Sequence, residues 1–444
     1  MIENYIAKEI DCACGRKHTS RVETIVIKRG VIDNEFVKYI KDGAFKKLIV
    51  VCDKKSYAAA GERVCAALEN AGVAYRLHRF SEQPLTPNEH AIGNLAMDIT
   101  PDIDLIVAVG SGTVGDVCRY VSAAMKLEYC TVGTAPSMDG YISGGSALIY
   151  NGMKINFETH TPKAVFFDPD ILASAPRDMV ASGVGDLLGK ISCLTDWKLS
   201  KIVTGEWHCE FISGIVDAAI EKTVGARDGI AAADSEATAT LLEALLLSGV
   251  GMDFAENSRP ASGCEHHMSH FLEMRYLIEG REAVFHGTKV GIGTVISLKA
   301  YEYLAKLTPD FTKIRNMKRE NFGEWEENIG AAFKRAADEI IELEKKAGKN
   351  APENVNRRLD VIEKNWNEIV SLAVSVLPHT LVKGILTQLD APTLPAEIGV
   401  EREMARQAIM YAKELRDRYT VLQLLYDIGE LENFANTVIE EYYG

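Results

Sequence analysis

An apolar run that leads directly into a glycine-rich turn constrains the fold of this chain more than any other feature. Residues 104–109 read DLIVAV, and residues 110–116 read GSGTVGD. A continuous apolar run is typical of a strand that is buried on both faces, as in a parallel sheet covered by helices. Similar runs at 47–52, 129–133 and 164–168 alternate with helical patterns. The first part of the chain is therefore predicted to be an α/β domain with a parallel sheet.

Local signals add one strand and two helices to this domain. The segment 22–27 (VETIVI) is rich in β-branched residues and predicts a strand. Residues 57–71 have helical periodicity, and residues 87–97 predict a second helix. For that second helix, Thr86 is the expected N-cap and Pro87 the expected first helical residue.

From about residue 170 the strand runs disappear and long helical patterns take over. This change predicts two domains, an α/β nucleotide-binding domain at 1–168 and an all-helical domain at 169–444. Within the second, the highly charged segment at about 308–362 is predicted to be an inserted helical excursion with solvated faces. The predicted helices of this part are 177–204, 233–250, 288–306, 366–377, 401–417 and 431–442.

Composition limits the function classes. The chain has 444 residues, 47% of them hydrophobic, which is enough for a sizeable core. Its net charge of -14 argues against nucleic acid or an anionic membrane as a partner, and a phosphate substrate would need a local basic cluster. The polar start shows no secretory signal, and no apolar run is expected to reach membrane-spanning length. We therefore expect a cytoplasmic protein with reduced thiols.

The stretch 257–291 holds four of the ten histidines. His266 and His270 are four residues apart, so they share one face of a helix, and His286 follows on a separate helix. Imidazoles from two helices form a ligand pair for a transition metal, and Asp186 is the best candidate for an oxygen ligand. Three protein ligands with one open position indicate a catalytic site. The alternative is that these histidines are ordinary packed or surface residues.

The glycine-rich turn is a candidate nucleotide site. Glycines such as Gly110 and Gly112 allow the backbone to approach a pyrophosphate, which the following helix N-terminus favours. Such turns also close many strand–helix units that bind nothing. Asp53 follows the run at 47–52. It either accepts hydrogen bonds from ribose hydroxyls, which favours NADH over NADPH, or is an ordinary acid at a strand end.

Further polar residues are candidates for the cofactor and the substrate. Thr134 and Ser137 lie in a loop of small residues and are able to hydrogen-bond cofactor phosphate or ribose. In the same loop, Asp139 either binds substrate hydroxyls or caps a turn. Lys190 and Arg259, with Lys289, form the candidate basic cluster for a substrate phosphate. Lys190 is four residues after Asp186, so a plain ion pair between the two is the alternative.

Near the N-terminus, the sequence CACGRKH places Cys12, Cys14 and His18 together. They are possible zinc ligands, but they are only three, and a surface loop with ordinary thiols is the simpler interpretation.

Five motifs together resemble a known superfamily. GSGTVGD, TAPSMDGYISGGSAL, SGVGDLLGK, SRPASGCEHHMSH and FHGTKVG stand in this order. They resemble the iron-type (group III) alcohol dehydrogenase and dehydroquinate-synthase-like superfamily, and SRPASG-x-EH is similar to its bacterial glycerol-1-phosphate dehydrogenase branch. The likeness covers about 22–306 and 366–435, and it fails over 308–362 and in the N-terminal cysteine segment.

The resemblance implies a Rossmann-like domain followed by an all-helical one. It implies the NAD(P)H- and metal-dependent, reversible reduction of dihydroxyacetone phosphate to sn-glycerol 1-phosphate by a homodimer. NAD(H) is the expected cofactor, NADP(H) is possible, and the metal would be zinc, nickel or iron. By this resemblance, the metal ligands are Asp186, His266 and His286, and His270 is a proton relay. The cofactor residues are Gly112 and Thr113 at the pyrophosphate, Asp116 near the nicotinamide amide, and Thr134, Ser137 and more weakly Lys154 in the cofactor cleft. Asp139 would contact a substrate hydroxyl.

Three alternatives remain open at this point. A polyol dehydrogenase acting on unphosphorylated glycerol would share the metal site but lack the basic cluster. A cyclase-lyase like dehydroquinate synthase would retain its nicotinamide through the cycle, although that branch has Glu where this chain has Asp186. The third alternative is a nucleotide- or metal-binding protein without catalytic activity.

Overall fold

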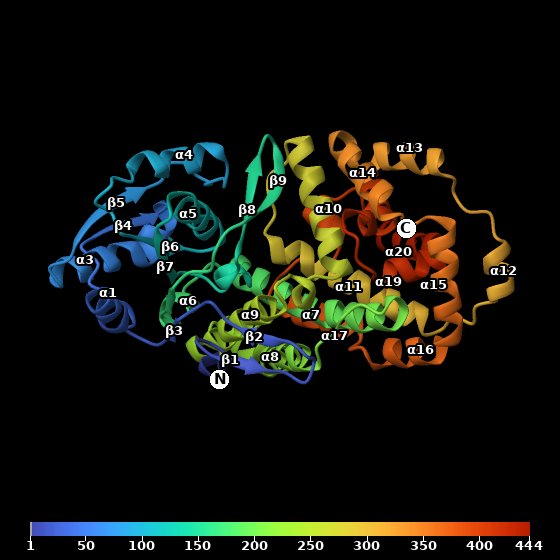
Figure 1. The fold of residues 1–444 in the computed structure, drawn as a ribbon, viewed down its shortest axis with the longest axis horizontal. Helices are drawn as coiled ribbons and strands as arrows, with labels where there is room; N and C mark the ends of the chain where they lie inside the picture. The colour runs from blue at the N-terminus through green and yellow to red at the C-terminus, as the bar shows by residue number, and fades with distance from the viewer. Residues whose placement is uncertain (1) are drawn as a thin grey trace. The chain divides into compact units, whose positions relative to one another are not determined.

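The computed structural model describes residues 2–444 and consists of two compact units (Figure 1). The sheet unit comprises Met1–Leu187 and Gly214–Asn257, and the helical unit comprises Leu188–Ser213 and Ser258–Gly444. The division falls within two helices, α7 and α8, each of which contributes residues to both units. This division groups several helices with the sheet. The predicted boundary at 168/169 marks a change of secondary structure, and its meaning as a domain boundary stays a prediction.

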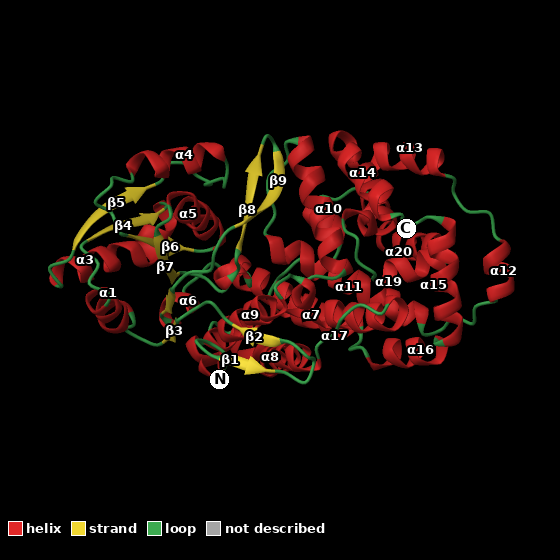
Figure 2. Ribbon diagram, viewed as in Figure 1, coloured by secondary structure: helices red, strands yellow, loops and turns green. Residues whose placement is uncertain are grey.

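The sheet unit is built on six parallel strands in the order β3–β10–β7–β6–β4–β5 (Figure 2). The strand bounds are β3 Thr24–Ile27, β4 Lys47–Cys52, β5 Ala74–Arg79, β6 Leu105–Gly110, β7 Glu128–Gly133 and β10 Ala164–Phe167. The parallel α/β sheet predicted from the continuous apolar runs is confirmed.

Helices cover both faces of this sheet. Alternate residues of a strand point to opposite faces, so each strand packs against helices on both sides. On one face Val50 and Val107 pack with α1 and α3, and on the other Ile49 and Ile106 pack with α4 and α5 (Figure 1). The bounds are α1 Val37–Asp42, α2 Lys54–Ser56, α3 Glu62–Asn70, α4 Glu89–Asp98, α5 Gly112–Met125 and α6 Pro169–Ala173.

The order of the strands identifies where a ligand can bind. The chain passes from β4 outward to β5, then returns to place β6 on the other side of β4 and continues to β7 and β10. The connections therefore diverge between β4 and β6. In open α/β sheets, ligands bind beyond the carboxyl ends of strands at such a switch point.

Three details of the sheet unit differ from the predictions. The helix predicted at 87–97 begins later, at Glu89, because the side chain of Asn88 accepts the N–H of Ala91 and is the actual N-cap. Strand β5 was not predicted, since three of its six residues are Arg or His and only Ala74 and Leu77 are aliphatic. Two antiparallel hairpins were also missed: β1 Glu9–Asp11 with β2 Lys17–Thr19, and β8 Gly145–Tyr150 with β9 Met153–Glu158.

Three long helices contribute to the sheet unit, α9 wholly and α7 and α8 in part. The bounds are α7 Arg177–Thr204, α8 Glu210–Ala231 and α9 Ser235–Ala255. The helix predicted at 177–204 is confirmed residue for residue, whereas α8 was not predicted.

The helical unit contains helices only (Figure 2). Its bounds are α10 Cys264–Glu279, α11 His286–Leu304, α12 Phe311–Asn316, α13 Phe322–Phe333, α14 Ala337–Ala347, α15 Pro352–Lys364, α16 Trp366–Ser375, α17 His379–Gln388, α18 Arg402–Tyr411, α19 Val421–Asp427 and α20 Leu431–Tyr443. Its core joins Phe271 of α10 and Ile292 of α11 to α18, α19 and α20.

The charged segment 308–362 is helical as predicted, and one face of it belongs to this core. Trp325 and Leu359 are buried there. Its charged residues also reach inward: Arg358 forms a buried two-pronged ion pair with Asp427, at 2.7 Å for both contacts. Nearby, Lys349 and Lys413 pair with the buried carboxylate of Glu414, and we refer to these two as the paired lysines.

Two described stretches, Ser235–Ala255 and Trp366–Gln388, are long and apolar enough by length and composition to cross a membrane. The expectation that no apolar run reaches that length was therefore wrong. The first stretch is α9, with 72% of its apolar window buried, as in a core helix. The second divides into two ten-residue helices at Pro378, each about 15 Å long against a hydrocarbon core of about 30 Å. Neither is therefore a continuous spanning helix exposed to lipid.

Candidate metal and nucleotide site

The carboxyl edge of the sheet carries the predicted nucleotide residues. Asp53 follows β4 at the switch point and caps α2, because its Oδ1 accepts the N–H of Ser56 at 2.7 Å. After β6, Ser111 is the N-cap of the fourteen-residue helix α5 but makes no side-chain cap hydrogen bond. The first turn of α5, with Gly112 and Thr113, therefore presents backbone N–H groups that its own N-cap side chain does not satisfy. This is the arrangement that binds phosphate in α/β folds.

Asp116 lies one turn into α5 and pairs with Arg119 at 2.7 Å. Arg119 is buried, and its guanidinium also donates to the carbonyls of Gly140 and Gly145 and to the hydroxyl of Tyr129. It therefore ties α5 to the loop after β7 and fixes the carboxylate of Asp116. Sequence analysis did not single out Arg119, because an arginine three residues after an acid on a helix usually forms a surface pair.

The loop after β7 lies closely against α7. Thr134 and Ser137 are buried in this loop, and the carbonyl of Ser137 accepts the hydroxyl of Ser182 at 3.0 Å. Gly183 permits this approach, since a Cβ at that position would lie 1.8 Å from the carbonyl oxygen of Pro136. The first glycine of the SGVGD motif, Gly183, therefore allows the helix to pack closely against the loop.

The same approach joins two predicted site residues. The backbone N–H of Asp139 donates to Oδ2 of Asp186 at 3.0 Å, and Asp186 is fully buried. The carboxylate of Asp139 accepts the hydroxyl of Ser248, on α9, at 2.9 Å. The sheet unit thus brings the predicted metal ligand and the predicted substrate-binding acid together.

In the helical unit, three predicted histidines form a cluster. His266 and His270 lie on one face of α10, and His286 begins α11. The ring centroids are 6.1 Å apart for His266–His270, 5.2 Å for His266–His286 and 5.6 Å for His270–His286. A ring nitrogen of His266 and one of His286 lie within 4.8 Å of one another. Two nitrogens this close are within the span of ligands to one metal ion, whose bonds to each are about 2.0–2.1 Å.

Glu265 orients His266. Its fully buried carboxylate faces Nδ1 of His266 at 2.7 Å and also accepts the N–H of Gly263 and the hydroxyl of Ser192. Burial alone raises the pKa of the Glu265 carboxyl, but these hydrogen bonds outweigh it and hold the pKa below its ordinary value. A carboxylate that accepts Nδ1–H leaves Nε2 with its lone pair, which is the form of histidine that binds metal.

Glu273 does the same for the other two imidazoles. Its Oε2 faces Nδ1 of His270 at 3.1 Å, and its Oε1 faces Nδ1 of His286 at 3.3 Å. Lys289, one turn along α11, contacts the same Oε1 at 3.2 Å. Neither glutamate was identified from the sequence. The available signal for Glu273 was its position seven residues after His266, on the same helix face.

The predicted basic residues lie in the helical unit with different surroundings. Lys190 is fully buried on α7. Arg259, also buried, donates Nε to Glu206 and Nη2 to the carbonyls of Asp196 and Tyr419. These contacts give Arg259 a structural role before α10, and its contact with a substrate phosphate stays a prediction. Lys289 forms an ion pair with Glu273 at 3.2 Å.

Lys154 and His267 are the remaining residues that sequence analysis considered, and the charge of Lys154 acts on the carboxyl of Asp116. Lys154 lies exposed on β9 of the sheet unit. The ring of His267 is buried without a hydrogen bond to either nitrogen, and burial lowers its pKa well below the ordinary value. His267 is therefore a neutral core residue.

Known proteins similar to this chain share both its sequence and its fold. Residues 26–176 match the family model of iron-containing alcohol dehydrogenases. The glycerol-1-phosphate dehydrogenase (NAD(P)+) of Bacillus licheniformis is 30% identical over 434 residues, 96% of this chain and 95% of that protein. The enzyme of the same name from Bacillus subtilis is 34% identical, over 93% of each chain.

The chain belongs to the glycerol-1-phosphate dehydrogenase family. Its members are oxidoreductases of the iron-containing alcohol dehydrogenase superfamily, so the resemblance stated from the motifs is confirmed. Among solved structures, sulfoacetaldehyde reductase from Bifidobacterium kashiwanohense in complex with NAD+ has a TM-score of 0.62. It is 15% identical, over 96% of this chain and 98% of that one, and the likeness is one of fold. The predicted combination of an α/β part with a parallel sheet and a helical part is confirmed.

Proposed function

We propose that this protein reduces dihydroxyacetone phosphate to sn-glycerol 1-phosphate, reversibly, with NAD(P)H and one divalent metal ion. The observation that carries the proposal is the histidine cluster of the helical unit, in which a carboxylate faces Nδ1 of His266, His270 and His286. Membership in the glycerol-1-phosphate dehydrogenase family supplies the substrate class.

The residues present fit a divalent metal. His266 and His286 each have Nε2 left to bind an ion, because Nδ1 is held by Glu265 or Glu273. Asp186 is the proposed third ligand, and one oxygen with two nitrogens suits zinc, nickel or iron. On α7, Asp186 stands three residues after Gly183 and three before Gly189, whose Cβ position lies 2.6 Å from Val290 of α11. Bound there, the ion would act as a Lewis acid toward the ketone oxygen.

The sheet unit is proposed to hold the cofactor at its switch point. Gly110, Gly112 and Thr113 bind the pyrophosphate at the start of α5, and Asp116, fixed by Arg119, faces the nicotinamide amide. The remaining cofactor contacts are assigned to Thr134, Ser137 and, through the ribose hydroxyls, Asp53. The second oxygen of Asp53 repels a 2′-phosphate, so NADH is the proposed preference. The nicotinamide supplies the hydride.

Three side chains are proposed to act on the substrate. Asp139 accepts a hydroxyl of the triose, and its own position is fixed by Ser248. Lys190 pairs with the phosphate, and Arg259 is the second proposed contact. His270 holds a proton on its ring and passes it to the substrate oxygen as hydride arrives, while Glu273 fixes its tautomer and stabilises its protonated form.

The enzyme is further proposed to be a cytoplasmic homodimer that acts on a small phosphorylated substrate.

A substrate screen tests the proposal. The protein, loaded with zinc or nickel, is assayed by NADH absorbance with dihydroxyacetone phosphate, dihydroxyacetone, glycerol, and the 1- and 3-phosphates of sn-glycerol. Turnover of dihydroxyacetone phosphate and of sn-glycerol 1-phosphate, but not of the 3-phosphate, is expected. Preference for glycerol would instead indicate a polyol dehydrogenase, and substrate conversion without a net NADH change would indicate a cyclase-lyase.

A lysine substitution tests the phosphate contact. Lys190→Ala is expected to raise KM for dihydroxyacetone phosphate far more than KM for dihydroxyacetone, because only the former carries the anion. Lys201→Ala is the matched control, since Lys201 is exposed on the same helix and pairs with Glu210. Equal effects of Lys190→Ala on both substrates would remove the assignment.

A further inference from the structure

A group of metal-binding side chains lies in the sheet unit at the tip of its N-terminal hairpin, and the proposed function does not use it. Strands β1 and β2 pair antiparallel, with Ile10 opposite His18. The connecting turn carries Cys12 and Cys14, and its Gly15 has φ +85°, where a side chain would be strained. The N–H of Gly15 donates to the carbonyl of Cys12 at 3.0 Å, which closes the turn.

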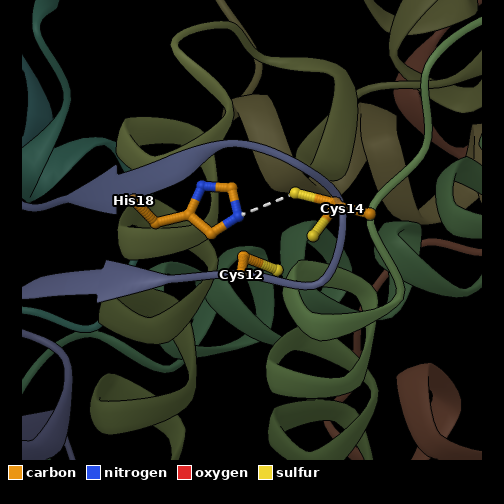
Figure 3. A group of neighbouring side chains, drawn as sticks. Cys12, Cys14 and His18 are labelled. Atoms are coloured by element: carbon orange, nitrogen blue, oxygen red, sulfur yellow. Dashed lines mark hydrogen bonds between the residues drawn. The ribbon is translucent and has the colours of Figure 1, made fainter.

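The three side chains face one another (Figure 3). Sγ of Cys14 lies 3.4 Å from Nε2 of His18, and one ligand atom each from Cys12, Cys14 and His18 lie within 4.8 Å of one another. Zinc bonds of about 2.3 Å to sulfur and about 2.05 Å to nitrogen, at a tetrahedral angle, place the two atoms about 3.6 Å apart. The observed separation is therefore close to that of two ligands on one ion.

His18 is held in the form that binds metal. Its side chain is fully buried, its Nδ1 contacts the backbone carbonyl of Phe254 at 3.0 Å, and its ring stacks on the ring of Phe254. A carbonyl only accepts hydrogen bonds, so Nδ1 carries the proton and donates it. Nε2, on the side of Cys14, then has a lone pair. A carbonyl that orients a histidine through Nδ1 is a regular partner at metal sites.

We propose that Cys12, Cys14 and His18 bind a zinc ion that is separate from the metal of the dehydrogenase reaction. Two thiolates and one imidazole form the donor set that zinc prefers, and the remaining tetrahedral position takes a water molecule or a further donor. The ion closes the tip of the hairpin. Hydrogen bonds attach the hairpin to α9: His18 contacts the carbonyl of Phe254, and the N–H of Arg21 donates to Asp253 at 2.8 Å. Its role is structural.

Cobalt substitution tests the site in the intact protein. Thiolate ligation gives Co2+ an intense sulfur-to-metal charge-transfer band in the near ultraviolet, whereas the proposed catalytic ligands Asp186, His266 and His286 include no sulfur. The band is expected in the wild-type protein and in a His266→Ala variant that lacks the catalytic metal. It is expected to be lost in Cys14→Ser. Absence of the band from the wild type, or its persistence in Cys14→Ser, overturns the proposal whatever the fate of the dehydrogenase activity.

Metal content gives a second, independent measurement. Mass spectrometry of the protein as purified is expected to find about one zinc ion fewer per chain in Cys14→Ser than in Cys65→Ser. Cys65→Ser is the matched control because it also removes a thiol, from the buried face of α3. Trypsin is expected to cut the hairpin after Arg16, Lys17 or Arg21 faster once a chelator has removed the zinc. Equal zinc contents, or copper in place of zinc, contradict the proposal.

Discussion

Replacement of Glu273 by glutamine tests how one carboxylate serves two histidines. A carboxylate has two acceptor oxygens, and Glu273 turns one to His270 and the other to His286. A glutamine side chain has one acceptor and one donor. Lys289 determines which way the amide lies, since it contacts the same oxygen as His286 and requires an acceptor there. The amide oxygen should therefore stay with His286 and Lys289, and the amide nitrogen should face His270.

Glu273→Gln is consequently expected to impair proton transfer more than metal binding. An N–H group facing Nδ1 of His270 forces its proton onto Nε2 and destabilises the protonated ring. The loss of one hydrogen bond to a charged group is on the order of 1.5–3 kcal/mol, or about 10- to 100-fold in kcat. Metal affinity should change by less than about tenfold, because Nδ1 of His286 keeps its acceptor.

Glu273→Ala removes the acceptor from both imidazoles and separates the two effects. It is expected to weaken metal binding about 10- to 100-fold, the usual effect of losing a partner that orients a ligand. Glu279→Gln is the matched control, because Glu279 lies on the same helix and pairs with Arg275 instead of a histidine. The assays are chelator competition for metal affinity and the pH profile of kcat. If Glu273→Gln and Glu273→Ala lose metal equally, or if neither differs from the control, the argument is refuted.

Three further substitutions test the packing and the charges of the two units. Gly183→Ala puts a Cβ 1.8 Å from the carbonyl oxygen of Pro136, so thermal unfolding should show a loss of at least about 1–3 kcal/mol. Arg358→Met leaves the buried carboxylate of Asp427 without its partner, and urea unfolding should show a loss of about 3–5 kcal/mol. Burial raises the pKa of Glu414, but the paired lysines outweigh it and lower the pKa to about 2. Its stabilising effect is therefore complete above its ordinary pKa and is lost as the pH falls from about 4.5 toward 2. Glu414→Gln should flatten the dependence of stability on pH in that window, and an unchanged slope would contradict this assignment.

The sequence predicted the features of the fold that depend on local patterns. Continuous apolar runs such as Lys47–Cys52 identified the buried strands, since only a strand covered on both faces has no polar alternation. Strand β5 was not predicted because it lies at an edge of the sheet, where polar residues such as Arg76 and Arg79 face solvent. Helix α8 was not predicted because its apolar residues are interrupted by charged and small ones, such as Asp217 and Gly225.

The sequence singled out the candidate ligands and missed the residues that support them. Histidines are few, so the spacing of His266 and His270 stood out. Glutamates are common on helices, and nothing local separates a surface glutamate from one such as Glu273, which is 11% exposed and faces two imidazoles. The distinction depends on the contact between α10 and α11, which the sequence does not reveal. Arg259 shows another limit of local patterns. Its contact with a substrate phosphate stays a prediction, and the sequence did not reveal the hydrogen bonds of its guanidinium to Glu206 and two carbonyls.

The glycines of the family motifs differ in what they do, and the structure separates them. In GSGTVGD, Gly110 ends β6, whereas Gly112 and Gly115 stand in the first turn of α5, where backbone N–H groups are available to a phosphate. Gly183 and Gly189 stand on a continuous helix and have no turn to make. A Cβ at Gly183 would strike the loop that carries Asp139, and one at Gly189 would strike α11 at Val290. Close approach of backbones is what these positions require. A motif rich in glycine therefore does not by itself indicate a nucleotide site, and in α7 it indicates the packing that holds Asp186 in place.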